Sequence, residues 1–279
     1  MTAMWWRHGS LNGPIGLIAG EGDFPVLFAK AASSLKKEVL VVGFHGYTDK
    51  RIEDFSSQTR YVELGAVDKL VETLKAWKVK NVALAGGVPK KRIYDASTPM
   101  DGTAKTILRK TPNRGDDHLL KAFVVFLKSA CGVSVVDSRL FLKDILASKG
   151  VMTDCAPTDS EKKDLFFGWK IAKGIGKMDI GQTVVVKEGN VLAVEAIEGT
   201  DAAIKRGGGL GVSGAVVVKT VKPRQDLRFD LPCIGLETLE SMKSAGCRVI
   251  GMEAGKTLML HKERLIQAAN HEQISLVGL

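Results

Sequence analysis

Short runs of consecutive apolar residues alternate with segments of helical periodicity through the first half of the chain. Such runs are typical of strands buried on both faces, and apolar residues three or four positions apart are typical of a helix packed on a sheet. This alternation predicts βαβ units and a mostly parallel sheet. The predicted strands are residues 15–19, 39–43, 61–64, 82–85 and 133–136, and the predicted helices are residues 24–35, 67–77 and 119–130.

The second half of the chain predicts a mixed α/β domain. A hairpin across Glu188-Gly189-Asn190 is expected between strands, and Thr200 is a candidate N-cap for a helix that Gly207-Gly208-Gly209 would end. We expect strands at 183–187, 191–195, 215–218, 248–251, 258–260 and 274–279, and helices at 138–148, 161–175, 200–206, 236–243 and 262–270. The predicted domains are residues 1–137 and residues 154–279, both α/β, with a linker region at 138–153.

Composition narrows the class of protein. The chain has 279 residues, 45% hydrophobic content and a formal net charge of +9, which favours anionic partners. No run of five cations occurs and aromatic residues make up 6%, so we expect no nucleic-acid partner. No apolar run approaches the ~20 residues that span a bilayer, and the N-terminus lacks a secretory signal, so a cytoplasmic location is expected.

Two glycine-rich turns follow predicted strands. Gly20-Glu21-Gly22-Asp23 opens the first helix, where backbone N–H groups can bind a phosphate, and Gly86-Gly87 ends the fourth strand at the edge that faces ligands. Pro25 stands where a dinucleotide fingerprint needs its third glycine, so NAD binding is weakly supported. Ordinary tight turns are the alternative for both.

Acidic residues gather at two predicted helix starts. Asp116 and Asp117 precede His118 before the apolar helix, and capping accounts for one aspartate but not for the pair. Glu195, Glu198 and Asp201 lie where a strand passes into a helix, beside Thr200. Carboxylate oxygens suit Mg²⁺, which needs only one or two of them when substrate phosphates supply the rest. Surface exposure and helix-start electrostatics are the alternative.

The segment from Lys219 to Pro232 carries two carboxylates and four cations directly after a predicted strand. This composition suits a site that holds an anion and a metal ion together. Its alternative is a solvated loop with weak surface ion pairs. The candidate residues are Lys222, Arg224, Gln225, Asp226, Arg228 and Asp230.

Five motifs occur in one order: Gly16-Leu17-Ile18-Ala19-Gly20-Glu21-Gly22-Asp23-Phe24-Pro25, Leu84-Ala85-Gly86-Gly87-Val88, Gly115-Asp116-Asp117-His118-Leu119-Leu120, Val194-Glu195-Ala196-Ile197-Glu198-Gly199-Thr200-Asp201 and Gln225-Asp226-Leu227-Arg228-Phe229-Asp230-Leu231-Pro232. Together they resemble the UDP-2,3-diacylglucosamine pyrophosphatases of lipid A synthesis, the alternative family unrelated to calcineurin-like phosphoesterases. The resemblance runs from about residue 15 to the C-terminus, and residues 1–12 precede it.

The resemblance implies a Mg²⁺-dependent hydrolase that cleaves UDP-2,3-diacylglucosamine to UMP and 2,3-diacylglucosamine 1-phosphate (lipid X). It also implies two α/β domains around a chamber, a Rossmann-like N-terminal domain and a catalytic C-terminal domain. It places the family's critical aspartate on Asp226. We also predict roles for other residues of these motifs. Arg228 and Asp230 join Asp226 in catalysis, and Glu195, Glu198 and Asp201 join it as metal ligands. Substrate contacts fall to Gly20, Gly22, Asp23, Gly86, Gly87, Asp116, Asp117, Thr200, Lys222 and Gln225.

Such an enzyme would contact the inner face of the inner membrane peripherally and could form a homodimer. Its two acyl chains require an apolar pocket, for which Phe123, Phe126, Phe166, Phe167 and Trp169 are candidates. The competing class is a non-hydrolytic nucleotide-sugar-binding protein or an NAD-dependent Rossmann protein. A relative that binds without turnover is a third possibility.

Overall fold

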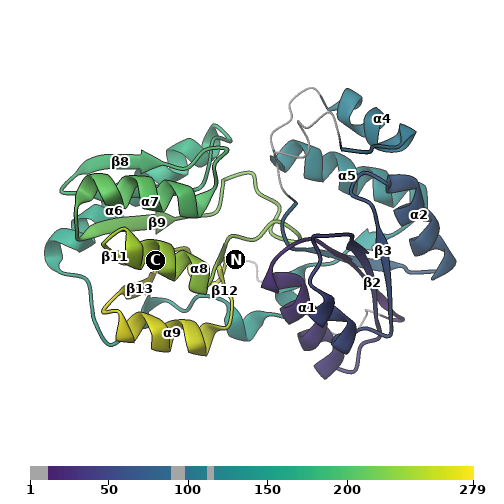
Figure 1. Ribbon diagram of the computed structural model, residues 1–279, viewed down its shortest axis with the longest axis horizontal. Helices are drawn as coiled ribbons and strands as arrows, with labels where there is room; N and C mark the ends of the chain where they lie inside the picture. Colours follow the sequence, from purple (N-terminus) through teal and green to yellow (C-terminus); the bar gives the residue numbers. More distant parts are fainter. Residues whose placement is uncertain (1–11, 89–97, 112–115) are drawn as a thin grey trace, which may run out of the picture. The chain divides into compact units, whose positions relative to one another are not determined.

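The computed structural model describes residues 12–88, 98–111 and 116–279, and these form two compact units, each with its own sheet (Figure 1). Unit 1 comprises Met1–Leu142 and Leu227–Asp230, and unit 2 comprises Lys143–Asp226 and Leu231–Leu279. Four residues of the second half therefore belong to the first unit, which the sequence pattern did not indicate. Of residues 1–12, which precede the family resemblance, residues 1–11 lie outside the described residues.

The sheet of unit 1 is wholly parallel, as the alternation of strands and helices predicted. Its strand order is β3-β2-β1-β4-β5, which matches the first five positions of the 3-2-1-4-5-6 order of dinucleotide-binding folds. Buried Val, Ile, Leu and Ala fill β1 and β2 because helices cover both faces. The strands are β1 (Ile15–Ala19), β2 (Val39–Phe44), β3 (Gln58–Val62), β4 (Asn81–Ala85) and β5 (Ser134–Val135).

The helices of unit 1 build its core on this sheet. Leu70 and Leu74 of α2 and Leu127 of α5 pack on one face against Val42 and Val82, while α1 packs on the other face (Figure 1). The helix α4 has no counterpart in the sequence prediction. The bounds are α1 (Asp23–Ser34), α2 (Val67–Ala76), α4 (Gly102–Lys110) and α5 (Asp116–Cys131).

Unit 2 holds a six-stranded mixed sheet in the order β6-β13-β11-β9-β7-β8. Strands β9, β11 and β13 are parallel, whereas β6, β7 and β8 run antiparallel to their neighbours. A separate parallel pair joins β10 to β12. The bounds are β6 (Gly150–Val151), β7 (Thr183–Lys187), β8 (Asn190–Val194), β9 (Ala215–Lys219), β10 (Cys233–Ile234), β11 (Cys247–Met252), β12 (Leu258–Met259) and β13 (Ser275–Gly278).

Helices cover both faces of this second sheet. The helix α6 packs on one face through Leu165, Ala172 and Ile175, and α7, α8 and α9 pack on the other (Figure 1). A capping box between Thr158 and Glu161 starts α6. The bounds are α6 (Asp159–Lys177), α7 (Thr200–Gly211), α8 (Leu236–Ser244) and α9 (Lys262–His271).

The predicted helix at 138–148 is wrong. Two short 3-10 turns stand there instead, η2 (Ser138–Leu140) and η3 (Lys143–Ile145). The Ser138 N–H donates to Arg228 O and the Ala147 N–H donates to Thr257 O. Pairing with distant segments therefore takes the groups that a helix would bond internally. The strand predicted at 61–64 also begins earlier, at Gln58, and ends at Val62.

The three consecutive glycines do not end α7, contrary to the sequence prediction, because two of them are needed where the helix packs closely. A Cβ on Gly207 would lie 2.6 Å from Val185 Cβ, and one on Gly208 would overlap Ala245 O. A Cβ on Gly209 would meet no atom within 4 Å. Residues 207 and 208 thus let α7 approach β7 and α8, and the helix continues to Gly211.

These glycines give a matched test of packing. Gly208→Ala forces α7 and α8 apart and should destabilise the protein by about 1–3 kcal/mol. Gly209→Ala should instead stabilise it by about 0.5–1 kcal/mol, since alanine favours a helix interior. The shift in thermal melting temperature of unit 2 measures both. Equal shifts in the two variants would contradict the packing role.

Candidate functional site

The two glycine-rich turns of unit 1 lie against each other at the carboxyl ends of β1 and β4. The Gly20 N–H donates to Ala85 O at 2.8 Å, and Glu21 and Gly87 exchange two backbone hydrogen bonds of 2.9 and 3.2 Å. A Cβ on Gly20 would overlap the Gly87 carbonyl, and one on Gly86 would lie 2.6 Å from Glu21 O. The structure therefore brings the predicted Gly20, Gly86 and Gly87 together, and the approach of one turn to the other explains their lack of side chains.

The remaining members of the first turn start α1. Gly22 is the N-cap at φ 88°, and Asp23 forms an ion pair of 2.6 Å with Arg51. Both partners are well exposed, so this pair contributes little to stability. These contacts account for the conformation of the turn without a bound phosphate. The substrate contacts predicted for Gly22 and Asp23 therefore stay predictions.

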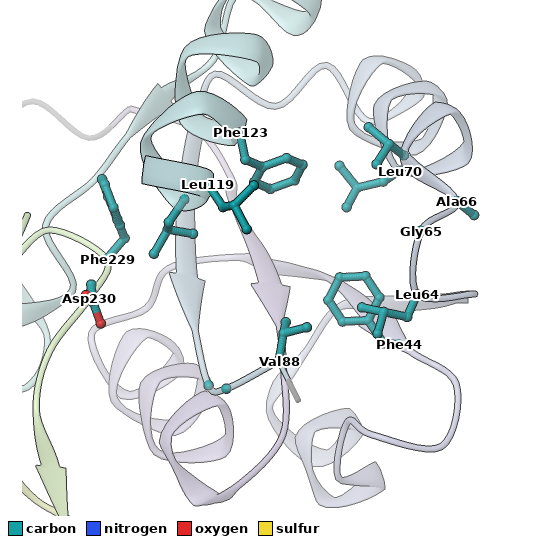
Figure 2. Close-up of a pocket in the computed structure, with 14 residues that line it drawn as sticks. Phe44, Leu64, Gly65, Ala66, Leu70, Val88, Leu119, Phe123, Phe229 and Asp230 are labelled. Carbon is teal, nitrogen blue, oxygen red and sulfur yellow. The ribbon is translucent and has the colours of Figure 1, made fainter. Parts of the chain in front are cut away.

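An apolar cavity of about 410 Å³ lies beside these turns (Figure 2). Its walls come from the carboxyl ends of β2 and β4, the loop before α2, the first turns of α5 and the segment 227–230. Among the lining residues that the structure describes, Asp230 alone has a charged side chain. The lining residues are Phe44, Leu64, Gly65, Ala66, Val67, Leu70, Gly86, Gly87, Val88, Leu119, Leu120, Phe123, Phe229 and Asp230.

The acidic motif near residue 226 is divided between the two units. Asp226 ends a stretch of unit 2, whereas Leu227–Asp230 belong to unit 1. Arg228 O accepts hydrogen bonds of 3.1 Å from both the N–H and the hydroxyl of Ser138. The Phe229 ring is buried in the core of unit 1. The chain thus passes from one unit into the other inside the motif, and Asp226 is half-buried immediately before the crossing.

A row of buried polar residues crosses three strands of unit 2. Glu195 after β8, Thr183 of β7 and Lys219 of β9 lie at one register. The Thr200 hydroxyl joins them, since it donates to Glu195 Oε1 at 2.9 Å and accepts from Lys219 Nζ at 3.0 Å. Lys219 Nζ also donates to Cys233 O at 2.8 Å. Thr200 is therefore a bridge at the start of α7 rather than its N-cap, which is Gly199.

The other two predicted metal ligands differ in how their oxygens are used. Glu198 forms an ion pair of 2.6 Å with Arg206 and accepts from the Ala196 N–H at 3.1 Å. Asp201 Oδ1 is buried and has no hydrogen-bond partner. Asp201 therefore keeps one carboxylate oxygen available, whereas Glu195 and Glu198 accept hydrogen bonds from donors of the protein.

A buried ion pair holds the chain where it leaves β9 toward the motif. Glu253 Oε2 accepts from the Val221 N–H at 3.1 Å and from Lys173 Nζ at 2.5 Å. Lys173 Nζ also donates to Val221 O at 2.9 Å. Both polar groups of Val221 are thereby bonded to one Lys–Glu pair, which fixes the direction of the following residues.

The next residues form a compact turn. Lys222 is buried and donates to Asp179 Oδ1 at 2.8 Å. The Lys222 N–H donates to Gln225 Oε1 at 2.9 Å, and the Gln225 N–H returns to Lys222 O at 3.0 Å. Asp226 follows this turn directly, so Lys222 and Gln225, predicted as substrate contacts, also support the loop that carries it.

The described side chains do not form a preassembled metal centre. Within residues 12–88, 98–111 and 118–279, no group of three or more His, Cys, Asp or Glu side chains could hold a metal ion. Glu195, Glu198 and Asp201 thus do not form a preassembled centre with Asp226. Mg²⁺ commonly uses one or two carboxylates together with substrate phosphates and water, which this donor set allows.

Sequence reasoning gave no role to Glu253, Lys173 or Lys219, although all three support predicted residues; Lys219 counted there only as one of four cations in its segment. Glu253 lies in Gly251-Met252-Glu253-Ala254-Gly255-Lys256-Thr257, which resembles a phosphate-binding loop but is one residue short. A lone carboxylate within an apolar segment was the available signal. The side chains of Asp116 and Asp117 lie outside what the structure describes.

The fold and these features define a two-domain α/β protein whose first domain has the strand order of nucleotide-binding folds. Residues 14–145 match the family model of the LpxI N-terminal domain, and residues 148–277 match that of the LpxI C-terminal domain. The chain is 30% identical over 275 residues to the UDP-2,3-diacylglucosamine pyrophosphatase LpxI of Caulobacter vibrioides, covering 95% of this chain and 97% of that protein. The chain belongs to the LpxI family.

Solved structures show only a distant likeness. A UDP-glucose-4-epimerase from Stenotrophomonas maltophila is 11% identical with a TM-score of 0.28, covering 53% of this chain and 41% of that one. A glycinamide-RNase-transformylase T from Mycobacterium tuberculosis is 12% identical with a TM-score of 0.26, covering 65% and 44%. The chain therefore spans less than half of either protein, and neither bears on its function.

The pKa values of two buried carboxylates, Glu253 and Glu161, indicate how the stability of unit 2 depends on pH in the acidic range. Burial raises the pKa of Glu253, but hydrogen bonds from Lys173, Lys256 and the Val221 N–H outweigh it and hold the pKa below its ordinary 4.5. Burial likewise raises the pKa of Glu161, and donors from Thr158 and Arg248 outweigh it, so that pKa is also lowered. A carboxylate whose pKa is lower in the folded protein than in the unfolded chain stabilises the fold when it is ionised. This contribution is complete above a pH of about 4.5 and is lost as the pH falls through the folded-state pKa.

Unit 2 should therefore lose stability as the pH drops below about 4.5. The double variant Glu161→Gln/Glu253→Gln should be less stable near neutrality, yet its stability should depend less on pH in that window. Urea-unfolding midpoints across the acidic range measure this. An unchanged slope in the double variant would show that other groups govern the acid response.

Proposed function

We propose that the chain hydrolyses UDP-2,3-diacylglucosamine to UMP and 2,3-diacylglucosamine 1-phosphate with Mg²⁺, a step of lipid A biosynthesis. The observation that carries the proposal is the full-length match to a protein named for this pyrophosphatase activity. The intact Gln225-Asp226-Leu227-Arg228-Phe229-Asp230 motif supports it, because the chain holds the loop before Asp226 through buried contacts.

In this proposal Asp226 provides the reactive carboxylate. It would hold Mg²⁺ together with the diphosphate, or accept a proton from the attacking water. When bound, the ion supplies charge neutralisation for the pyrophosphate, the main requirement of phosphoryl transfer. Lys173 and Glu253 hold Val221, so Asp226 is delivered from an anchored loop.

Cations of the same segment would bind phosphate oxygens. Arg224 and Arg228 are exposed, so their guanidinium groups can meet an anionic ligand. Lys222 is buried against Asp179, which favours a supporting role beside its predicted substrate contact. Asp230 lines the apolar cavity of unit 1 and would lie next to the lipid part of the substrate.

The residues around α7 would form a second substrate-facing group. Asp201 offers its buried oxygen to the outer shell of the ion, as its lack of a hydrogen-bond partner allows. The Glu195–Thr200–Lys219 bridge would hold the start of α7 in place for it. Glu198, paired with Arg206, would act further from the ion.

The lipid substrate also bears on location. None of the described helices is long and apolar enough to cross a membrane. A diacyl sugar nucleotide resides in a bilayer, so the enzyme would work from the cytoplasmic side in peripheral contact with the inner membrane. The net charge of +9 supports attraction to anionic lipids.

Replacement of Asp226 tests the catalytic assignment. Asp226→Ala should lower hydrolysis of UDP-2,3-diacylglucosamine by at least about 100-fold while calorimetry still detects substrate binding. Asp159→Ala, an exposed aspartate of the same unit, serves as the control and should retain activity. EDTA should abolish turnover and added Mg²⁺ should restore it. Full activity in Asp226→Ala, or activity untouched by chelation, would refute the respective assignment.

The ion pair that holds Val221 gives a separate prediction. Glu253→Gln should lower kcat by about 10-fold to 100-fold with little change in KM, because the loop carrying Asp226 loses its fixed direction. Glu161→Gln is the matched control, since Glu161 is similarly buried, similarly ion-paired and also in unit 2. Both variants should lower the melting temperature. Equal kcat losses in the two would show that Glu253 acts through stability alone.

A further inference from the structure

We propose that the outer surface of α4 and α5 in unit 1 docks on an anionic lipid bilayer, an assignment that rests on the lipid substrate of the proposed function. The two helices lie side by side (Figure 1). We call their solvent-exposed surface the basic face. It consists of Lys105, Arg109 and Lys110 of α4 together with Val125 and Lys128 of α5, all of which are exposed.

The charges of the basic face have one sign. The helix α4 contains no acidic residue, and α5 contains none from His118 onward. Among the residues that the structure describes, no carboxylate forms an ion pair with any of the cations of the face. Lys105 and Arg109 are four positions apart on one helix, where two like charges repel each other and an opposite pair would stabilise. The face therefore keeps its positive charge available for an anionic partner.

Two acids at the start of α4 fix the position of this helix. Asp101 accepts from the Ala104 N–H and from the Asp68 N–H, both at 2.7 Å. Asp68 in turn accepts from the Thr103 hydroxyl at 2.6 Å. Both carboxylates thus tie the start of α4 to the start of α2, and the cations of α4 are presented from an anchored helix.

The helix dipole is an ordinary alternative explanation for some of these cations. Arg109 and Lys110 lie in the last turn of α4 and Lys128 lies in the last turn of α5, where a positive charge is favourable. The dipole gives no reason for Lys105, which lies nearer the start of its helix. It also gives no reason for the exposure of Val125.

Apolar side chains lie among the cations. Val125 is 68% exposed. A cavity of about 720 Å³ between α4 and α5 brings it together with Ile107, Phe126 and Lys110. Apolar groups surrounded by Lys and Arg suit the interfacial region of a bilayer, where the cations reach lipid phosphates and the apolar groups leave water. A nucleic acid would match the charge, but the fully exposed apolar group is aliphatic and offers no ring on which a base stacks.

Vesicle binding tests the assignment without requiring hydrolysis. The full chain is sedimented with vesicles of equal parts phosphatidylglycerol and phosphatidylcholine, and with vesicles of phosphatidylcholine alone. We expect binding to the anionic vesicles only, and its loss at high salt. Lys105→Gln/Arg109→Gln should weaken this binding by about 25-fold, since each cation near an anionic surface contributes about fivefold.

Lys30→Gln/Lys50→Gln is the matched control. It removes the same net charge from two exposed residues of unit 1, one on α1 and one on the 3-10 helix η1 (Lys50–Phe55), which contacts α1. Because α1 covers the opposite face of the sheet from α5, this variant should bind vesicles as the wild type does. Equal weakening in both double variants would show that net charge governs binding, and it would overturn the assignment.

A fluorescent reporter tests contact at the face itself. The emission of Val125→Trp, measured against the wild type, should shift to shorter wavelength with anionic vesicles and be quenched when brominated phosphatidylcholine is included. Leu35→Trp replaces a residue that is 55% exposed at the end of α1, and it should show neither effect. An unshifted spectrum of Val125→Trp in the presence of bound vesicles would overturn the assignment.

Activity measurements separate this inference from the proposed function. Lys105→Gln/Arg109→Gln should hydrolyse UDP-2,3-diacylglucosamine at the wild-type rate in neutral detergent micelles but more slowly in anionic vesicles. Vesicle binding without hydrolysis contradicts only the proposed function, whereas hydrolysis in micelles without any vesicle binding overturns only the membrane assignment. Binding of a single-stranded oligonucleotide that the double variant weakens, without vesicle binding, would assign the face to nucleic acid instead.

Discussion

The candidate site depends on how one backbone segment leaves β9 (Ala215–Lys219). A single buried ion pair, Lys173–Glu253, bonds both the N–H and the carbonyl of Val221, and the Lys222–Asp179 pair and the Gln225 turn hold the next residues. Glu253 is buried and also accepts from Lys256 Nζ, so three donors of the protein hold its carboxylate. This arrangement gives Asp226 a rigid support although the residue lies in a loop.

The same segment links the two units. Leu227–Asp230 leave unit 2, bury Phe229 in the core of unit 1 and contribute Asp230 to the apolar cavity. The motif at residues 225–230 therefore contributes to a polar loop of unit 2 and to the lining of the apolar cavity of unit 1.

Much of the fold follows from the sequence because it rests on local periodicity. Buried parallel strands such as Ile15–Ala19 read as continuous apolar runs, and the hairpin around Gly189 follows from its turn residues. The wrong predictions lie where contacts between distant parts of the chain determine the local structure. The region 138–148 pairs its backbone with Arg228 and Thr257, and Gly207 and Gly208 serve packing rather than helix termination. The partners in these contacts cannot be identified from the residues that are adjacent in the sequence.

The candidate site shows the same limit. The motif at 225–232 and the acids near α7 (Thr200–Gly211) are recognisable as sequence, and so is the turn at Gly20. The interlocking of Gly20 with Gly87, however, gives those glycines a structural cause that spacing alone does not reveal. The supports Lys173, Lys219 and Glu253 are separated from their partners by 14 to 80 positions, so only the folded chain identifies them.

Phosphorus NMR of the purified protein with UDP-2,3-diacylglucosamine and Mg²⁺ directly measures whether this chain cleaves the diphosphate bridge of a diacylated UDP-sugar. We expect both diphosphate resonances to disappear and two phosphomonoester resonances to replace them, one from UMP and one from 2,3-diacylglucosamine 1-phosphate. Persistence of the diphosphate resonances with fully folded protein would contradict it.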